Sequence, residues 1–223
     1  MKQIQGREAS IMQIKSKQRV ANHGEVFTSE REVNSMLDLV KQETERIDSR
    51  FLEPACGEGN FLSSILNRKF DTITSRYKNS QIEFDKYSMV AFSSIYGIEL
   101  LKDNTIKCRE RLLSIFEQRY RCIHEGRIDE NLIRSIKFIL KRNIINGNAL
   151  TLKTGDSTNS NIIFSEWSFI NNKVKRRDFT YNELLTNELM NDLPLFSDLG
   201  HKAFIPKPIK EFPMINYKFV FRL

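Results

Sequence analysis

A Gly-x-Gly loop marks the part of the chain best suited to bind a small ligand. Gly57 and Gly59 follow a short apolar segment and Glu53, and apolar residues at helical spacing come directly after them. Glycines let the backbone approach a ligand closely, and a helix N-terminus offers free N–H groups. The dinucleotide-binding pattern requires a third glycine where Leu62 stands, and Glu53 would repel a phosphate but attract an ammonium group. The loop therefore favours a zwitterionic ligand such as S-adenosylmethionine over NAD.

Two polar residues follow two further strand candidates. Glu99 ends the segment 94–98, and Asn148 follows the segment 143–147. A carboxylate at a strand end can accept hydrogen bonds from both ribose hydroxyls, and an amide there can bond an adenine edge. Each also has a plainer interpretation, Glu99 as a surface residue that begins a helix and Asn148 as a turn residue. Together with Glu53, however, they occupy three consecutive strand ends, where ligands of open α/β sheets bind.

Alternating helix and strand patterns predict the elements that position these residues. Ser29 and Glu32 form a capping-box pattern that begins a helix over roughly residues 30–46. Two basic amphipathic helices are predicted over residues 103–119 and 129–142. The order helix, strand, helix, strand, helices, strand predicts an α/β fold with a doubly wound sheet.

Two other regions interrupt or follow this pattern. Residues 70–90 are polar without a clear period, which predicts an insertion loop or an irregular helix. The segments 161–169 and 174–179 predict a β-hairpin with a turn at residues 171–172, and Thr180 is expected to cap a short helix.

Composition excludes several classes of protein. The chain has 223 residues, of which 40% are apolar, enough for a core, and no run of about 18 apolar residues that would cross a membrane. Three widely spaced cysteines and three histidines argue against a disulfide framework and a Cys/His zinc site, so no metal is expected. Without a secretory signal pattern, the chain is expected in the cytoplasm.

The net charge of +7 is concentrated in two segments. Residues 1–20 sum to +4 and residues 101–142 to +5, whereas the remainder is slightly acidic. Such segments favour a polyanionic partner, most simply nucleic acid, although solvated helix faces also carry Lys and Arg.

Four stretches in this order resemble the adenine-N6 DNA methyltransferases of restriction–modification systems. They are HGEVFTSEREVNSML at 23–37, EPACGEGNF at 53–61, YGIEL at 96–100 and NIINGNALT at 143–151. The closest resemblance is to the modification subunits and fused restriction–modification enzymes, and it covers about residues 20–155. It implies a Rossmann-like S-adenosylmethionine-dependent methyltransferase sheet with helices on both faces, followed by a C-terminal β-hairpin and loop extension.

The resemblance also implies roles for individual residues. Phe27 and Thr28 would line the methionine end of S-adenosylmethionine, and Glu99 would bind its ribose. Ile98 or Leu100 would lie against the adenine ring, and plain core packing is the alternative for Phe27, Ile98 and Leu100. The residues expected around the amino acid moiety of the cofactor and around its adenine are Glu53, Ala55, Cys56 and Gly57, and Asn148 and Ala149, respectively.

One element of the family pattern is missing. These enzymes carry an Asn/Asp-Pro-Pro-Tyr/Phe tetrapeptide, which bonds the target amine and stacks on the flipped base. No Pro-Pro occurs in the chain. The only comparable segment contains Ser165, Glu166 and Trp167, which are candidates for a substitute catalytic loop or, alternatively, part of a hairpin at the edge of the fold.

The sequence thus predicts three segments: a basic arm or helix at 1–22, a cofactor-binding domain at 23–160, and a hairpin, short helix and Pro-containing tail at 161–223. We expect an incomplete DNA methyltransferase-like protein that binds S-adenosylmethionine and double-stranded DNA and needs a second restriction–modification polypeptide for catalysis and target recognition. The alternatives are a non-catalytic DNA-binding or regulatory module on the same fold, and a small-molecule methyltransferase.

Overall fold

The computed structural model describes residues 28–185 and 207–223, which fall into two compact units, 1–42 and 43–223. In the first unit, α3 (Glu30–Asp38) begins with the predicted capping box. The backbone N–H of Ser29 donates to Glu32 Oε2 at 3.0 Å, and the N–H of Glu32 donates to Ser29 Oγ at 3.3 Å. The single helix predicted over 30–46 is interrupted by a turn after Asp38, and α4 (Lys41–Glu45) follows. The predicted arm at 1–22 lies outside the described residues.

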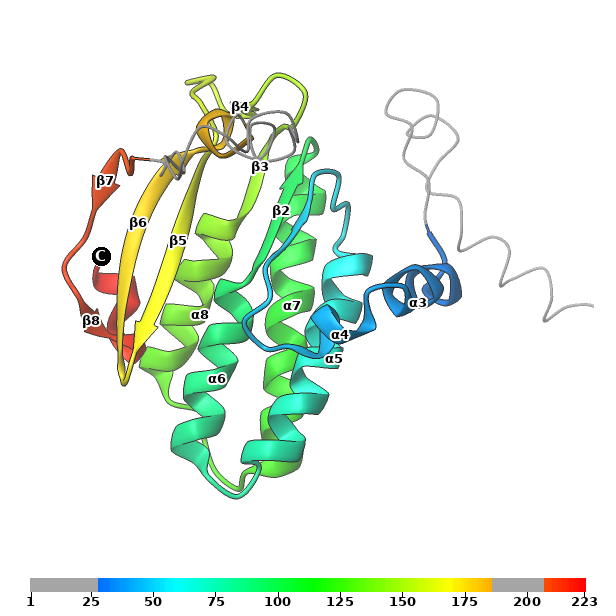
Figure 1. The fold of residues 1–223 in the computed structure, drawn as a ribbon, viewed down its shortest axis with the longest axis vertical. Helices are drawn as coiled ribbons and strands as arrows, with labels where there is room; N and C mark the ends of the chain where they lie inside the picture. The colour runs from blue at the N-terminus through cyan, green and yellow to red at the C-terminus, as the bar shows by residue number, and fades with distance from the viewer. Residues whose placement is uncertain (1–27, 186–206) are drawn as a thin grey trace, which may run out of the picture. The chain divides into compact units, whose positions relative to one another are not determined.

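The second unit is built on a mixed sheet, so the α/β class is confirmed. The strands β1 (Phe51–Glu53), β2 (Ile95–Glu99) and β3 (Ile144–Asn148) are parallel, and β4 (Lys153–Thr154) pairs antiparallel with β3 (Figure 1). The sheet order is β1-β2-β3-β4. Because neighbouring strands follow chain order, the described residues lack the reversal of strand order that defines a doubly wound sheet. The doubly wound arrangement therefore stays a prediction.

Four long helices connect the parallel strands: α5 (Asn60–Tyr77), α6 (Gln81–Ser93), α7 (Lys102–Ile123) and α8 (Glu130–Asn143). The prediction of a loop or irregular helix over 70–90 is wrong, since α5 and α6 fill this region apart from a short turn between them. Aromatic rings of three helices meet in one buried cluster, formed by Phe70, Phe84, Phe92, Phe116 and Tyr120. This cluster gives many of the chain's Phe side chains a buried position between the helices.

The two faces of β2 have different neighbours. Gly97 faces α5, because a Cβ built at Gly97 would come within 3.0 Å of Leu62 Cδ1. On the opposite face, Ile98 packs with Ile162, Phe164 and Tyr181. The contacts described on this face thus come mainly from the C-terminal hairpin, with a short helical segment at residues 181–185, instead of from long helices on both faces.

The predicted C-terminal hairpin is confirmed. Its strands β5 (Ile163–Ile170) and β6 (Lys173–Thr180) pair antiparallel over their full lengths, and Asn171 adopts φ +53° at the turn. The predicted cap is present as well, because the N–H of Glu183 donates to Thr180 Oγ1 at 3.3 Å. The short strands β7 (Lys210–Glu211) and β8 (Ile215–Asn216) both pair with β6.

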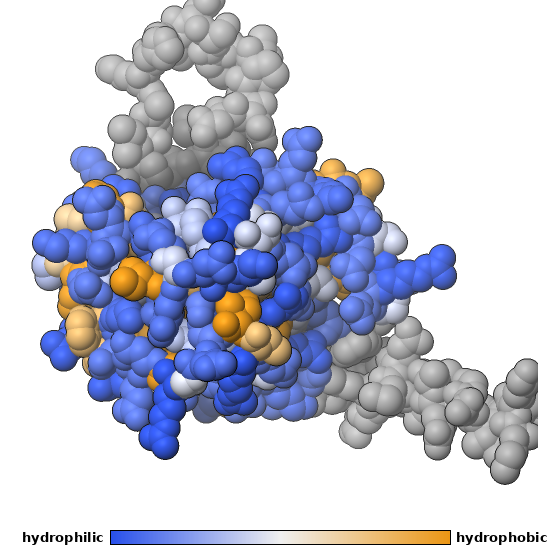
Figure 2. Space-filling view, turned by 90° about the horizontal axis from the view of Figure 1, so that it is seen from below, coloured by the Kyte–Doolittle hydropathy of each residue, from blue (hydrophilic) through white to orange (hydrophobic). Residues whose placement is uncertain are grey.

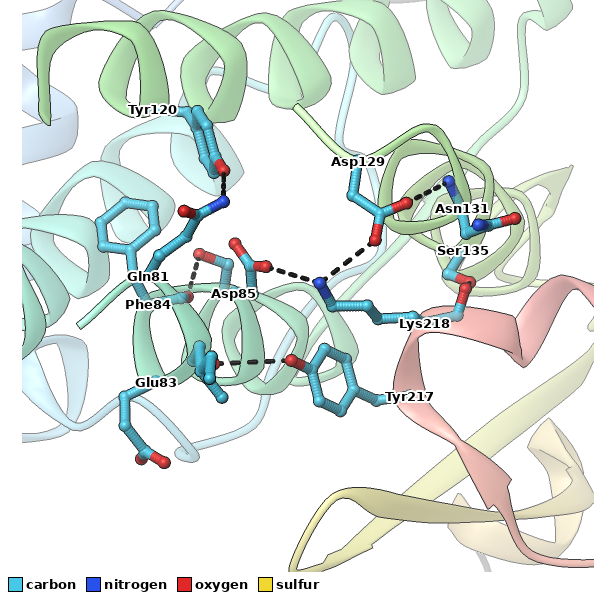
Figure 3. Close-up of polar contacts among 12 residues, drawn as sticks. Gln81, Glu83, Phe84, Asp85, Tyr120, Asp129, Asn131, Ser135, Tyr217 and Lys218 are labelled. Carbon is cyan, nitrogen blue, oxygen red and sulfur yellow. Dashed lines mark hydrogen bonds and ion pairs between the residues drawn. The ribbon is translucent and has the colours of Figure 1, made fainter. Parts of the chain in front are cut away.

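The last described residues form the 3₁₀ helix η2 (Tyr217–Arg222), which an ion-pair network fastens to α6 and α8. Lys218 Nζ lies 3.0 Å from Asp85 Oδ2 and 3.1 Å from Asp129 Oδ2, so one ammonium group joins three segments (Figure 3). Ser135 Oγ also donates to the carbonyl oxygen of Lys218 at 2.8 Å. The predicted segments 23–160 and 161–223 both contribute to the second unit.

The outer surface has no single dominant apolar area in the view that Figure 2 gives. Among the described residues on this face, hydrophilic side chains predominate and apolar ones form small separate groups. No helix in residues 28–185 or 207–223 combines the length and apolar content needed to cross a membrane.

Candidate cofactor-binding site

The topology brings the predicted site residues of the second unit to one edge of the sheet. Because β1, β2 and β3 are parallel and adjacent, their carboxyl ends lie side by side. Glu53, Glu99 and Asn148 are the last residues of these three strands. The three strand-end positions chosen from the sequence are therefore neighbours in space, as a ligand site of this kind requires.

The Gly-x-Gly loop needs its glycines for two different reasons. Both Gly57 (φ +54°) and Gly59 (φ +85°) have left-handed backbone conformations that disfavour other residues. A Cβ at Gly59 would in addition lie 2.6 Å from Cys108 Sγ, whereas a Cβ at Gly57 would meet no described residue within 4 Å. Gly59 is thus required for packing against α7, and Gly57 faces open space that a ligand could use.

Glu99 ties this loop to the loop that follows β2. Its Oε2 accepts a hydrogen bond from the N–H of Gly57 at 2.8 Å, and its Oε1 accepts one from the N–H of Leu101 at 2.8 Å. The residue is nearly buried. Because each carboxylate oxygen can accept two hydrogen bonds, both oxygens retain capacity for hydroxyl donors such as those of a ribose.

Glu53 and Cys56 shape the loop from its other side. Glu53 Oε1 accepts from the N–H of Ala55 at 3.2 Å, and the N–H of Cys56 donates to the carbonyl of Ile98 at 3.0 Å. The Cys56 thiol is turned toward the sheet, where a Cβ at Gly97 would come within 2.9 Å of its Sγ. A hydrogen bond with a neighbouring thiol and burial both raise the pKa of Cys56. Cys56 therefore positions the loop as an unreactive thiol.

Asn148, the last residue of β3, begins a turn that leaves part of its side chain available to a ligand. Asn148 Oδ1 accepts from the N–H groups of Leu150 and Thr151 at 2.8 and 3.2 Å, so its turn role is present. Its side-chain NH₂ donates to no acceptor among the described residues and remains a donor for an adenine nitrogen. Ala149 packs partly buried beside the cluster around Ile98.

The two apolar candidates for the adenine ring differ in accessibility. Ile98 is 0% exposed and packs in the core, whereas Leu100 is 51% exposed beside Glu99. Leu100 is therefore the side chain of this pair that a ligand can reach. Of the remaining cofactor candidates, Phe27 lies outside the described residues, and Thr28 belongs to the first unit.

The three candidates for a substitute catalytic loop lie in β5 and make structural contacts. Ser165 Oγ donates to Asp178 Oδ1 at 2.7 Å, and Trp167 Nε1 donates to Asn143 Oδ1 at 3.0 Å. The carboxylate of Glu166 forms ion pairs with Arg50 at 2.9 Å and Arg177 at 2.6 Å. These contacts favour the alternative that the segment is part of a hairpin.

Two residues that sequence reasoning did not select also support the site. Asn146 Nδ2 donates to the carbonyls of Glu99 and Leu100 at 2.9 Å each, which fixes the end of β2. Its position two residues before Asn148, and thus on the same face of the strand, is the signal that could have identified it. Lys107 pairs with Glu58 of the glycine loop at 2.9 Å, but nothing in their separation along the sequence reveals this contact.

The described residues contain no group of His, Cys, Asp and Glu side chains arranged to hold a metal ion. What the site offers is an open glycine loop, a carboxylate with spare acceptor capacity and an amide donor at three adjacent strand ends. No known protein family, curated protein or solved structure matches the chain.

Proposed function

We propose that the chain binds S-adenosylmethionine at the carboxyl edge of the β1-β2-β3 sheet and acts in adenine-N6 methylation of DNA within a restriction–modification system. The observation that carries the proposal is the Glu99 carboxylate, which lies between the Gly57 and Leu101 loops and keeps spare acceptor capacity. The sequence resemblance assigns a ribose-binding role to this same position.

The described residues fit the cofactor in three respects. Gly57 borders open space, as close approach of a ligand to the backbone requires. Glu53 supplies a carboxylate for an ammonium group, and the Asn148 NH₂ is a donor for adenine. In this proposal the sheet is the Rossmann-like core of a methyltransferase, and its location in the cell is the cytoplasm.

The chain's own residues would bind and orient the cofactor. When bound, S-adenosylmethionine supplies an electrophilic methyl group for direct attack by the adenine amine. Glu99 and Asn148 would hold the adenosine half, and Glu53 the amino acid half, so that the methyl group faces the target. No Pro-Pro turn occurs in the sequence to hold a flipped base, and therefore we assign that function to a second polypeptide.

The sharpest test of the ribose contact compares two ligands and two proteins by calorimetry. The wild-type chain and Glu99→Gln are each titrated with S-adenosylmethionine and with its analogue that lacks the ribose hydroxyls. We expect the substitution to weaken binding of S-adenosylmethionine by about tenfold or more and binding of the analogue much less, since loss of a hydrogen bond to a charged group is worth about 1.5–3 kcal/mol.

Glu110→Gln, an exposed change on α7, is the matched control, and thermal unfolding checks that both variants fold. Absence of any S-adenosylmethionine binding by the wild-type chain would overturn the proposal. Robust transfer of a labelled methyl group to duplex DNA by the isolated chain would instead overturn the need for a second polypeptide.

A second candidate function is a non-catalytic DNA-binding or regulatory module. The specific observation in its favour is that Ser165, Glu166 and Trp167 of β5 all have structural partners elsewhere in the second unit. Binding of duplex DNA without any binding of S-adenosylmethionine would favour this module. The small-molecule methyltransferase would show the reverse pattern.

A further inference from the structure

A cavity of about 400 Å³ lies at the outer edge of β3, and its lining includes none of the residues expected to contact the cofactor. Helix α7, the last turn of α8, β3 and the segment around β4 form its walls. Its polar lining residues include Lys102, Thr105, Arg109, Lys141, Asn146 and Thr154. Asn146 also supports the end of β2 beside Glu99, but no residue expected to contact the cofactor lines the cavity.

The cavity exists because the sheet edge is covered only in part. β4 pairs with Gly147 and Asn148, and the N–H of Gly155 donates to the carbonyl of Asn146 at 2.9 Å. Further back along β3, the carbonyl of Ile144 accepts from Arg109 Nε at 3.0 Å instead of from a neighbouring strand. A charged side chain therefore occupies the edge position, which prevents strand pairing there and places a guanidinium group in the cavity wall.

The lining is strongly basic. Arg109 is half-buried, and burial lowers its pKa from the ordinary value, which shows that its charge is poorly solvated. Lys102 and Lys141 are exposed, and neither has an ion-pair partner within the described residues. In contrast, other cations of α7 are paired, Lys107 with Glu58 at 2.9 Å and Arg119 with Asp71 at 2.8 Å.

The single acidic lining residue does not neutralise this set. Asp156 Oδ1 accepts from Thr154 Oγ1 at 2.9 Å and from the N–H of Thr158 at 3.1 Å. Hydrogen bonds from these threonines lower the pKa of Asp156, so it is ionised but directed to its own loop. Three cations against one occupied carboxylate leave the cavity with a net positive charge.

We propose that this cavity binds a phosphate group. Arg109 Nη1, which donates to no acceptor among the described residues, and the two lysines supply charged donors. The donor groups of Thr105, Asn146 and Thr154 are already bonded to carbonyl oxygens or to Asp156, so the three cations carry the binding. The volume exceeds what a phosphate alone needs, and Ile106 and Ile145 offer an apolar wall for an attached sugar. The phosphate comes either from the backbone of duplex DNA, which rests on the proposed function, or from a free nucleotide.

The test compares the wild-type chain with Lys102→Gln/Lys141→Gln. Both lysines are exposed and make no ion pair in the described structure, so the variant is expected to fold normally. The control, Lys78→Gln/Lys137→Gln, removes two exposed lysines that do not line the cavity and has the same net charge. One arm measures the affinity for a labelled DNA duplex by fluorescence anisotropy over a series of salt concentrations. The other arm measures the affinity for ATP by calorimetry.

We expect the cavity variant to lose about tenfold in affinity relative to the control in one of the two arms. If DNA is the source, the slope of log affinity against log salt concentration should also decrease by about 2, one for each lysine. Loss confined to the ATP arm identifies a free nucleotide as the source. Equal affinity of cavity variant and control in both arms, or no binding of either probe by the wild-type chain, would overturn the proposal.

A titration with S-adenosylmethionine on the same preparations separates the two proposals. The cavity variant should bind the cofactor as the control does. If the cofactor fails to bind but the cavity variant still loses affinity for a phosphate ligand, the proposed function is wrong and the phosphate site stands.

Discussion

Replacing Lys218 by Met removes the cation that fastens η2 to the helices. Lys218 is the partner of Asp85, whose side chain is 1% exposed, and of Asp129, whose side chain is partly exposed (Figure 3). Asp85 Oδ1 is buried and has no hydrogen-bond partner among residues 28–185 and 207–223, so Lys218→Met leaves both oxygens of this carboxylate without a partner there. Met preserves most of the aliphatic volume, which isolates the effect of the charge.

The expected loss follows from the burial of Asp85. Removing one partner of a buried ion pair lowers the free energy of unfolding by about 3–5 kcal/mol. For a chain of this size that corresponds to a decrease in Tm on the order of 10 °C. The pair Arg121–Glu117, 3.7 Å apart and largely exposed, is the control, because Arg121→Met should change the free energy of unfolding by at most about 0.5 kcal/mol.

The pH dependence provides a second signature. Burial raises the pKa of Asp85, and the hydrogen bond from Lys218 opposes this rise. Loss of Lys218 should therefore raise this pKa further, so that folded Asp85 keeps its proton at pH values where the unfolded chain has lost it. Stability of the variant then falls more steeply with rising pH than stability of the wild type, and the difference between them is smallest in acid.

Urea unfolding of wild type, Lys218→Met and Asp85→Asn/Lys218→Met over pH 4.5–8 measures these differences. The double variant should recover much of the lost stability, because it no longer buries an unpaired charge. A loss of less than about 1 kcal/mol at pH 7, or a loss independent of pH, would refute the reasoning.

Three further predictions concern separate parts of the second unit. Gly59→Ala should lower the free energy of unfolding more than Gly57→Ala, because both have positive φ but only Gly59 also abuts Cys108 Sγ; chemical denaturation of both variants checks the order, and equal losses would contradict it. Burial lowers the pKa of Lys69 to about 7, so the wild type should gain stability relative to Lys69→Met as the pH rises from 7 toward 10.5, since the unfolded chain then binds the extra proton; a flat difference in urea unfolding would exclude a neutral buried amine. Trp167→Phe removes the 3.0 Å hydrogen bond to Asn143 and should lower the free energy of unfolding by about 1–2 kcal/mol while leaving affinity for S-adenosylmethionine unchanged, whereas a change in that affinity would connect β5 to the cofactor.

Local patterns predicted the parts of the fold that depend on neighbouring residues. The Ser29–Glu32 capping box, the hairpin with its turn at Asn171 and the cap at Thr180 each involve residues close in the sequence, and all three are present. The alternation of strands and helices likewise predicted three strand ends carrying Glu53, Glu99 and Asn148.

The error at residues 70–90 has a physical cause in distant partners. Helix α6 buries Asp85 and Ser88 among its apolar residues, so its sequence looks polar and aperiodic. Asp85 is tolerated there because Lys218 neutralises it, and no local pattern could reveal a partner so far along the chain. Lys69 conceals the apolar stripe of α5 in the same way, since its amino group is buried against the carbonyls of Ile47 and Ser49.

In the candidate site, too, sequence predicts the local features but not the contacts between distant residues. Its three strand-end residues follow from sequence, but the role of Glu99 as a link between two loops does not. The order of the strands in the sheet could not be predicted from the sequence either. The periodicity of a strand indicates which of its residues are buried, but not which strand lies beside it. The described strands follow chain order, and a doubly wound sheet therefore stays a prediction.

The contrast between the hairpin and the parallel sheet bears on the order of folding. In β5–β6 the pairs nearest the turn join residues a few positions apart, whereas Phe51 must find Ile95, and Gly97 must find Ile144. Hairpins form in about 1–10 μs, but a parallel pair has to wait until the intervening helices have closed a long loop. The hairpin can therefore form first and expose the apolar side chain of Phe164. Tyr96 and Ile98 of the central strand then pack against it.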